Sequence, residues 1–158
     1  MSADYDLVSN IRMPVGTVLA TLDADANGPA VDTQLYKSVT LGWYVGIGGI
    51  TFTSTNRLDI VIQESDDNSA WNEVVADDLI LPYGLTYGTA GSGIVKSYTA
   101  AKAAADTVYN LVGYRGKKRY CRLRLEFGGT HSSGTPIEII TLQGHPMHKP
   151  VWQSSIET

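Results

Sequence analysis

The stretch NRLDIVIQESDDNSAWNEVV, residues Asn56 to Val75, decides the fold class of this chain. From Leu58 to Ile62 every second residue is a large aliphatic one, which is the period of a strand with one buried face. The turn-forming run SDDNS follows, and apolar residues return after it. We predict a β-hairpin with Trp71 packed in the core, and we expect Asp66 and Asp67 in its turn to hydrogen-bond their own backbone.

A second stretch, KKRYCRLRLEF from Lys117 to Phe127, has the same strand period. Its apolar residues from Cys121 to Phe127 alternate with Arg122, Arg124 and Glu126. Successive side chains of a strand point to opposite faces, so the apolar set faces one way and the charged set the other. We expect this strand to pack beside the hairpin as its structural partner.

The remaining segments predict an all-β chain: an antiparallel, jelly-roll-like β-sandwich with at most one short helix. Thr99 to Thr107 is the segment with helix propensity, and a short helix or an irregular crossing would both suit it. Asp23 to Asp32 is expected to be a loop, whereas the order of the strands cannot be deduced. Further strands are expected at residues 17–22, 36–45, 50–52, 94–98, 108–114 and 137–142. The predicted domain organisation is an N-terminal arm (1–16), a sandwich domain (17–143) and a C-terminal tail (144–158).

The composition is that of an ordinary soluble globular protein, with 43% hydrophobic and 18% charged residues in a chain of 158. Cys121 is the single cysteine, which excludes an intrachain disulfide framework and fits synthesis in a reducing cytoplasm. The longest apolar run, from Leu41 to Phe52, is too short and too rich in glycine to span a bilayer. The first ten residues lack the pattern of a secretion signal. We therefore expect no membrane partner.

Charge is divided unequally along the chain. Residues 1–79 contain twelve acids and three bases, and residues 80–158 contain nine bases and four acids. Six of the twelve Lys and Arg residues lie between Arg115 and Arg124. Two interpretations stay open: a positive patch that binds an acidic protein surface, or a solvated strand face whose charges pair within the chain. The net charge of −4 argues against direct binding of nucleic acid.

Candidate contact residues come from this basic cluster, from a long loop and from the tail. The loop, Leu81 to Gly93, contains four glycines and two tyrosines, and tyrosine is a common anchor of interfaces. In the tail, Trp152 is an aromatic residue that we expect to be exposed. The residues expected to contact a partner are Tyr83, Tyr87, Arg115, Lys117, Lys118, Arg122, Arg124 and Trp152.

Signals for chemistry are weak. The aspartates between Asp23 and Asp32 do not have the spacing of a calcium loop. His145 and His148 are three residues apart, but Pro146 separates them and no cysteine pair or Glu-His motif joins them. THSSGT, residues 130–135, is not a nucleophile elbow. We therefore expect no catalytic, cofactor or metal site, and we expect that the protein is not an enzyme.

Two short segments resemble discoidin-like β-sandwich modules. SDDNSAW, residues 65–71, is similar to their Ser-x-Asp-Gly-x-x-Trp signature, with Asn68 in place of the glycine. RYCRL, residues 119–123, matches the Arg-Tyr-x-Arg-Leu strand that packs beside that signature. The resemblance implies a β-sandwich and carries over no binding residue.

A wider resemblance covers most of the chain beyond the N-terminal arm. The succession of GWYVG (42–46), FTSTNRLDIVIQESDDNSAWNEV (52–74) and VGYRGKKRYCRLRLEFGGTHSSGTPIEIITLQGHPMHKPV (112–151) is similar to a family of small structural proteins. These are encoded in the head-gene region of tailed bacteriophages, and such proteins often decorate or cement the capsid.

This resemblance implies a capsid decoration or cement protein on the outer surface of the phage head, made in the host cytoplasm. Its expected partners are the major capsid protein and other copies of itself, and a trimer would match the threefold sites of an icosahedral shell. A glycan- or host-surface-binding module on the virion, or a neck or tail component, are the alternatives.

Overall fold

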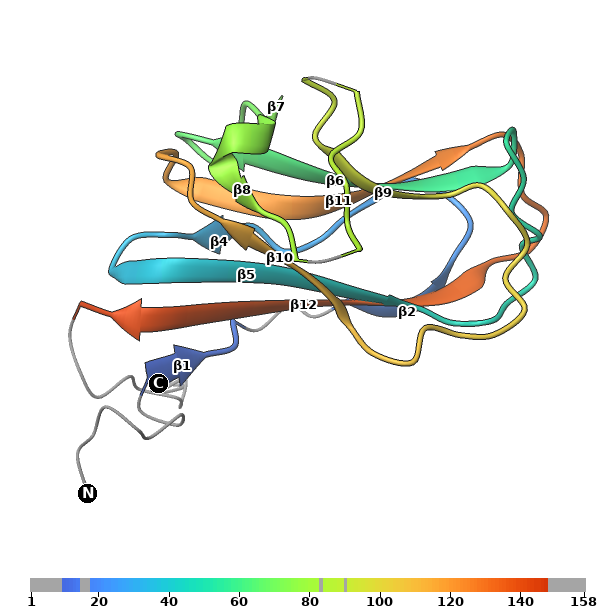
Figure 1. Ribbon diagram of the computed structural model, residues 1–158, viewed down its shortest axis with the longest axis horizontal. Coiled ribbons are helices and arrows are strands. Elements are labelled where there is room, and N and C mark those ends of the chain that lie inside the picture. The colour runs from blue at the N-terminus through green and yellow to red at the C-terminus, as the bar shows by residue number, and fades with distance from the viewer. Residues whose placement is uncertain (1–9, 15–17, 83, 90, 148–158) are drawn as a thin grey trace.

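The chain folds into two antiparallel β-sheets packed face to face, so the predicted all-β sandwich is confirmed. The structure is a computed structural model that describes residues 10–14, 18–82, 84–89 and 91–147. In Figure 1, β6, β9 and β11 lie in the upper layer, and β5 and β12 lie in the lower one. The core lies between these layers.

Among the described residues, each sheet contains six strands. The lower sheet is here called sheet A. Its strand order is β1-β12-β5-β10-β8, and β2 also pairs with β12. The upper sheet, sheet B, has the order β3-β11-β6-β7, with β4 also paired to β11 and β9 to β6. Sheet A consists of β1 (Ile11–Arg12), β2 (Val18–Leu22), β5 (Tyr36–Val45), β8 (Leu79–Ile80), β10 (Asn110–Tyr114) and β12 (Thr135–Pro146). Sheet B consists of β3 (Ala26–Asn27), β4 (Val31–Asp32), β6 (Arg57–Ser65), β7 (Asn72–Glu73), β9 (Ile94–Tyr98) and β11 (Tyr120–Gly128).

The order of the long strands is that of a jelly roll. In sheet A, β2, β12, β5 and β10 are successive neighbours, and in sheet B β3 and β4 share one side of β11, followed by β6 and β9. Strands early in the chain thus pair with strands late in the chain, as when a long hairpin is rolled up into two Greek keys. Most of the fold therefore depends on contacts between residues far apart in sequence.

The opening hairpin and its structural partner are confirmed. β7 returns beside β6 with Gln63 opposite Glu73, and β11 pairs with β6 along its whole length, from Tyr120 opposite Ser65 to Gly128 opposite Arg57. Along β11, Cys121, Leu123 and Leu125 are buried and the residues between them are half-buried, which is the predicted alternation. These two strands form the centre of sheet B.

Trp71 does not pack in the core, contrary to the prediction. The tryptophan of the core is Trp43 on β5, whose side chain is fully buried between the sheets. Asn72 pairs with Glu64, so strand alternation directs Trp71 to the outer face of sheet B, where its ring lies 4.0 Å from the guanidinium of Arg122. The face on which Trp71 lies depends on how β7 pairs with β6 across the turn. The sequence does not show this pairing.

Two further expectations are resolved by the backbone. Residues 99–107 form an irregular crossing rather than a helix, and a short 3₁₀ turn lies instead at Ala76–Asp78. The expected loop from Asp23 to Asp32 contains β3 and β4, which was missed. Between them Gly28 donates its N–H to the Leu123 carbonyl at 2.7 Å, and a Cβ on Gly28 would lie 2.9 Å from that oxygen. Glycine therefore permits an approach that interrupts the strand.

Parts of the expected arm and tail belong to sheet A. Ile11 and Arg12 pair with Gly144 and Gln143 of β12, and β12 itself continues to Pro146. The sheet thus extends into both segments within residues 10–147.

Candidate functional site

The basic cluster pairs largely with acids of the first half of the chain. Lys118 Nζ lies 2.5 Å from Asp66 Oδ2, and Arg119 donates to Asp32 Oδ2 at 2.9 Å. The hydrogen bond from Arg119 holds the pKa of Asp32 below its ordinary value. Intramolecular pairing, one of the two open interpretations, is thus present and accounts for much of the charge asymmetry.

The two arginines on the outer face of β11 are also engaged. Arg124 lies 3.3 Å from Asp25 and 3.2 Å from Glu126. Arg122 donates twice to Gln63 Oε1, at 2.9 and 2.7 Å, and its guanidinium lies over the ring of Trp71. A guanidinium held in this way is preorganised, and it covers one face of the indole.

The turn before β11 presents the least engaged positive charge of the cluster. Arg115 is exposed and donates its Nε–H to the Asp77 carbonyl at 2.7 Å. Lys117 is exposed and forms no ion pair or hydrogen bond with the described part of the chain. Together with Lys118, these residues place three cations at one end of the sandwich.

Tyr87 lies within its own loop. Its ring packs against the core cluster, its hydroxyl donates to the Val74 carbonyl, and the N–H of Gly93 donates to that hydroxyl at 3.0 Å. The side chain thus holds the loop against β7 and β9. Tyr83 and Trp152, the other two aromatic candidates, lie outside the described residues.

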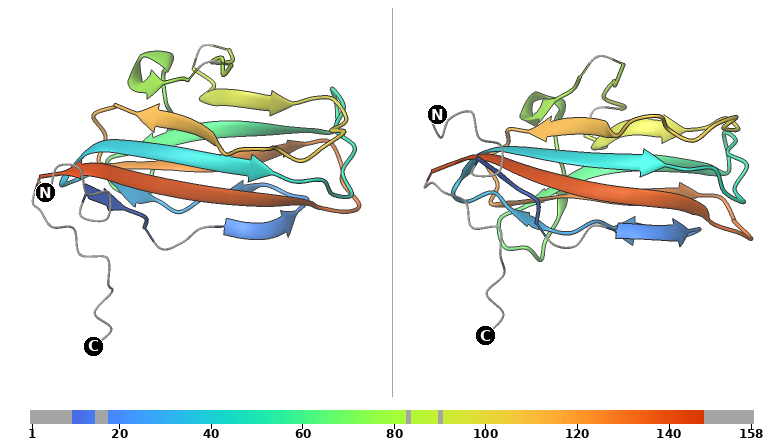
Figure 2. Two further views of the ribbon diagram at one scale, coloured as in Figure 1. Left: turned by 60° about the horizontal axis from the view of Figure 1, so that its bottom comes forward. Right: turned by 90° about the horizontal axis from the view of Figure 1, so that it is seen from below.

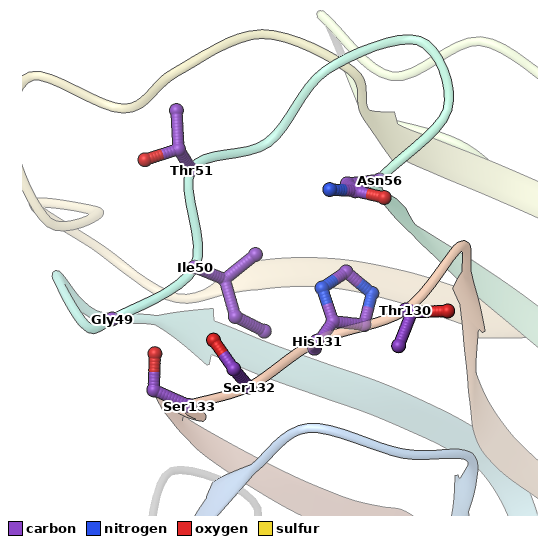
Figure 3. Close-up of a pocket in the computed structure, with 8 residues that line it drawn as sticks. All are labelled: Gly49, Ile50, Thr51, Asn56, Thr130, His131, Ser132 and Ser133. Carbon is purple, nitrogen blue, oxygen red and sulfur yellow. The ribbon is translucent and has the colours of Figure 1, made fainter.

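A small polar pocket opens beside the turn between β11 and β12 (Figure 3). Its volume is about 190 Å³, below the roughly 300–1,000 Å³ that is usual for small-molecule sites. His131 Nε2 donates to the Gly128 carbonyl at 2.9 Å, and no hydrogen bond joins its ring to the neighbouring Ser132 or Ser133. The geometry therefore gives no activated serine. The pocket is lined by Gly49, Ile50, Thr51, Asn56, Thr130, His131, Ser132 and Ser133.

Other reactive groups are structural. Burial raises the pKa of the Cys121 thiol, which makes this cysteine unreactive. Within residues 10–147, gaps aside, no three His, Cys, Asp or Glu side chains come together as a metal site would require. No helix in the described ranges has the length and apolar character needed to cross a membrane.

The outer face of sheet A differs from that of sheet B, and sequence reasoning missed it. Alternation directs Leu19 of β2, Tyr44 of β5, Ile80 of β8, Leu111 of β10, and Ile140 and Leu142 of β12 away from the core. We call these six residues the apolar face. The available signal was the run IEIITL, where apolar residues fill both faces of one strand rather than one.

Comparisons with known proteins leave these surfaces to be interpreted on physical grounds. No protein-family model matches the chain, and no curated protein matches it.

Proposed function

We propose that this protein is a bacteriophage virion structural protein, a decoration or cement subunit that binds the major capsid protein on the outside of the head. The proposal joins the resemblance of residues 42–46, 52–74 and 112–151 to phage head-region proteins with the jelly-roll sandwich. Jelly rolls recur in viral capsid proteins and in lectins, which is support by analogy alone.

The observation that carries the proposal is the contrast between the two outer faces. On sheet B, charged residues are paired with one another, as Arg124 is with Asp25. On sheet A, Leu19 is 74% exposed and Ile80 is 57% exposed, at the two sides of a face whose other members are also apolar. A grouped apolar surface of this kind supports a role in protein–protein contact.

The basic turn is the proposed contact with the shell. Arg115, Lys117 and Lys118 lie at one end of the sandwich, and Lys117 is exposed and forms no ion pair with the described residues. Exposed cations of this kind accelerate association with an acidic surface and fix its orientation. Each bound subunit would bury further interface on the shell and stabilise it by mass action.

The test is binding of the purified protein to shells that lack it. We expect co-sedimentation with such shells, a higher melting temperature of the decorated shells, and recovery of this chain from purified virions by mass spectrometry. Lys117→Glu is expected to weaken binding by roughly tenfold, whereas Lys117→Arg keeps the charge and should bind normally. Failure to bind shells, together with absence from virions, would overturn the proposal.

A further inference from the structure

We infer that the apolar face of sheet A is a self-association surface, on which the same face of a second copy of this chain stacks about a twofold axis. The inference rests on the proposed function only in treating the chain as a component of an assembly. It names a partner and a surface that the shell contact does not use.

The exposure of these side chains is the first reason. Leu19, Ile80 and Leu111 are 74%, 57% and 37% exposed. They lie on three different strands of one sheet, with the half-buried Ile140 and Leu142 between them. The right-hand view of Figure 2 looks onto this sheet from below and shows its strands side by side.

The centre of the face is covered by side chains on both sides of a glycine. Gly42 pairs with Leu111 on one side and with Ile140 on the other. A Cβ at Gly42 would lie 2.7 Å from Leu111 Cδ2 and 2.8 Å from Ile140 Cγ1, so these two side chains close over the glycine. A sheet covered in this way lets a second sheet pack at the usual separation of about 10 Å.

The size of the face suits a dimer. Neighbouring strands lie about 4.8 Å apart, so the five strands from β2 to β8 span about 20 Å. With about four residues along each strand and their side chains, the face covers on the order of 500 Å². A standard interface buries about 800 Å² on each partner, with an apolar centre and a polar rim. The apolar face is large enough to be that centre.

The charge of the face points to a partner like itself. Among the outward-directed residues of the described strands of sheet A, Glu138 is the one that carries charge at neutral pH, and it accepts a hydrogen bond from the Tyr109 hydroxyl. Glu138 pairs with Tyr44, and the next pair along the strands on this face is Ile140 with Gly42. A twofold axis that runs across the strands at the row of Gly42 would therefore place the two Glu138 side chains on opposite sides of that row. Stacking the face on itself then brings no like charges together.

A second copy of this chain is available to cover the apolar face before the subunit meets a shell. A subunit that adds to an assembled shell must first persist in solution, where covering the apolar face removes its side chains from water. A second copy is present from synthesis onward and at equal concentration. A single face that covers itself closes as a twofold dimer, so this surface favours a dimer over a trimer.

The test is the oligomeric state of the full chain in solution, by sedimentation equilibrium between about 1 and 100 µM. We expect a dimer. We expect Leu111→Lys to raise the dimer dissociation constant by at least roughly thirty-fold, because it places a charge at the centre of the apolar face. Leu111→Met is the conservative control. Ser97→Lys, at an exposed position of β9 in sheet B, is the control for added charge, and both should remain dimeric.

Folding of each variant is checked by circular dichroism, and Ile80→Lys at the edge of the face replaces Leu111→Lys if the latter does not fold. A wild-type monomer or trimer, or a folded lysine variant that remains dimeric, would overturn the inference. A monomer that still binds shells would refute this inference alone, whereas a dimer that binds no shell would refute the proposed function alone.

Discussion

The indole N–H of Trp43 donates a hydrogen bond of 3.1 Å to the hydroxyl of Tyr98, and this bond crosses from one sheet to the other. Trp43 is on β5 of sheet A, and Tyr98 is on β9 of sheet B. The Tyr98 hydroxyl in turn donates to Asp106 Oδ2 at 3.0 Å. Asp106 also accepts from the N–H of Val45 and from Lys102 Nζ. The chain of bonds thus joins both layers to the irregular crossing.

Tyr98→Phe should lower the free energy of unfolding by about 2 kcal/mol, because it leaves the buried Trp43 N–H without an acceptor. For a chain of this size the melting temperature should fall by roughly 4 to 8 °C. Tyr120→Phe is the control, since the half-buried Tyr120 hydroxyl makes no hydrogen bond with described residues, and its effect should be within about 0.5 kcal/mol. Thermal unfolding of the three proteins decides the matter, and equal stability of Tyr98→Phe and wild type would contradict it.

The two tryptophans of the sandwich should respond very differently to the same substitution. Trp43→Phe loses the bond to Tyr98 and leaves a void in the core, so it should cost about 2 kcal/mol or more. Trp71→Phe keeps an aromatic ring beneath Arg122 and should cost less than about 0.5 kcal/mol. Urea unfolding of both variants measures the difference. Comparable losses would mean that Trp71 also anchors the fold.

Most strands of this fold were predictable from alternating apolar and polar residues, whereas residues 50–52, which were expected to be a strand, form none. β5 and β9 have the predicted bounds, Tyr36–Val45 and Ile94–Tyr98, because apolar and β-branched residues dominate them. β3 and β4 were not predictable, because they hold to β11 by backbone bonds on either side of Gly28 and have no apolar pattern of their own. Strand order depends on long-range pairing, which local pattern does not encode.

The candidate surfaces were less predictable than the strands. Clustered bases along the chain suggested a positive patch, but a sequence does not show that Asp32 and Asp66 reach Arg119 and Lys118 from distant segments. The apolar face depends on the register of several strands at once, since Leu111 and Ile140 meet only across Gly42. Such surfaces are assembled from several strands of a sheet, so no single segment of the sequence predicts them.

The turn between β6 and β7 should make the stability of the protein depend on pH, with lower stability in acid. Asp67 Oδ1 accepts hydrogen bonds from the N–H groups of Ala70 and Ser69, at 2.9 and 2.8 Å, as expected of a turn aspartate. These bonds hold the pKa of Asp67 below its ordinary value. The ionised Asp67 side chain therefore stabilises the folded protein at pH values above its pKa in the unfolded chain, about 3.9. This stabilisation is lost as the pH falls through the lower pKa of the folded protein.

Asp67→Asn should therefore melt below wild type at pH 7, and the difference should shrink between about pH 4 and pH 2. Melting curves across this range measure the effect, and carboxyl NMR of wild type gives the Asp67 titration directly. A difference that stays constant down to pH 2 would contradict the assignment.

Two buried threonines on β12 should give opposite results when changed to valine. Thr141 is 3% exposed, and its Oγ1 has no hydrogen-bond partner among the described residues. Thr141→Val removes a desolvated hydroxyl at nearly constant shape and should stabilise the protein by about 1 kcal/mol. Thr135 Oγ1 instead donates to the Gly46 carbonyl at 3.2 Å, so Thr135→Val should cost about 1 kcal/mol.

Both variants are measured by urea unfolding against wild type, and each serves as the control for the other because the strand, the burial and the chemical change are the same. The sign of the difference depends on the hydrogen bond alone. If Thr141→Val lost as much stability as Thr135→Val, the Thr141 hydroxyl would have to be paired in solution, and a buried water between the sheets would be the natural partner.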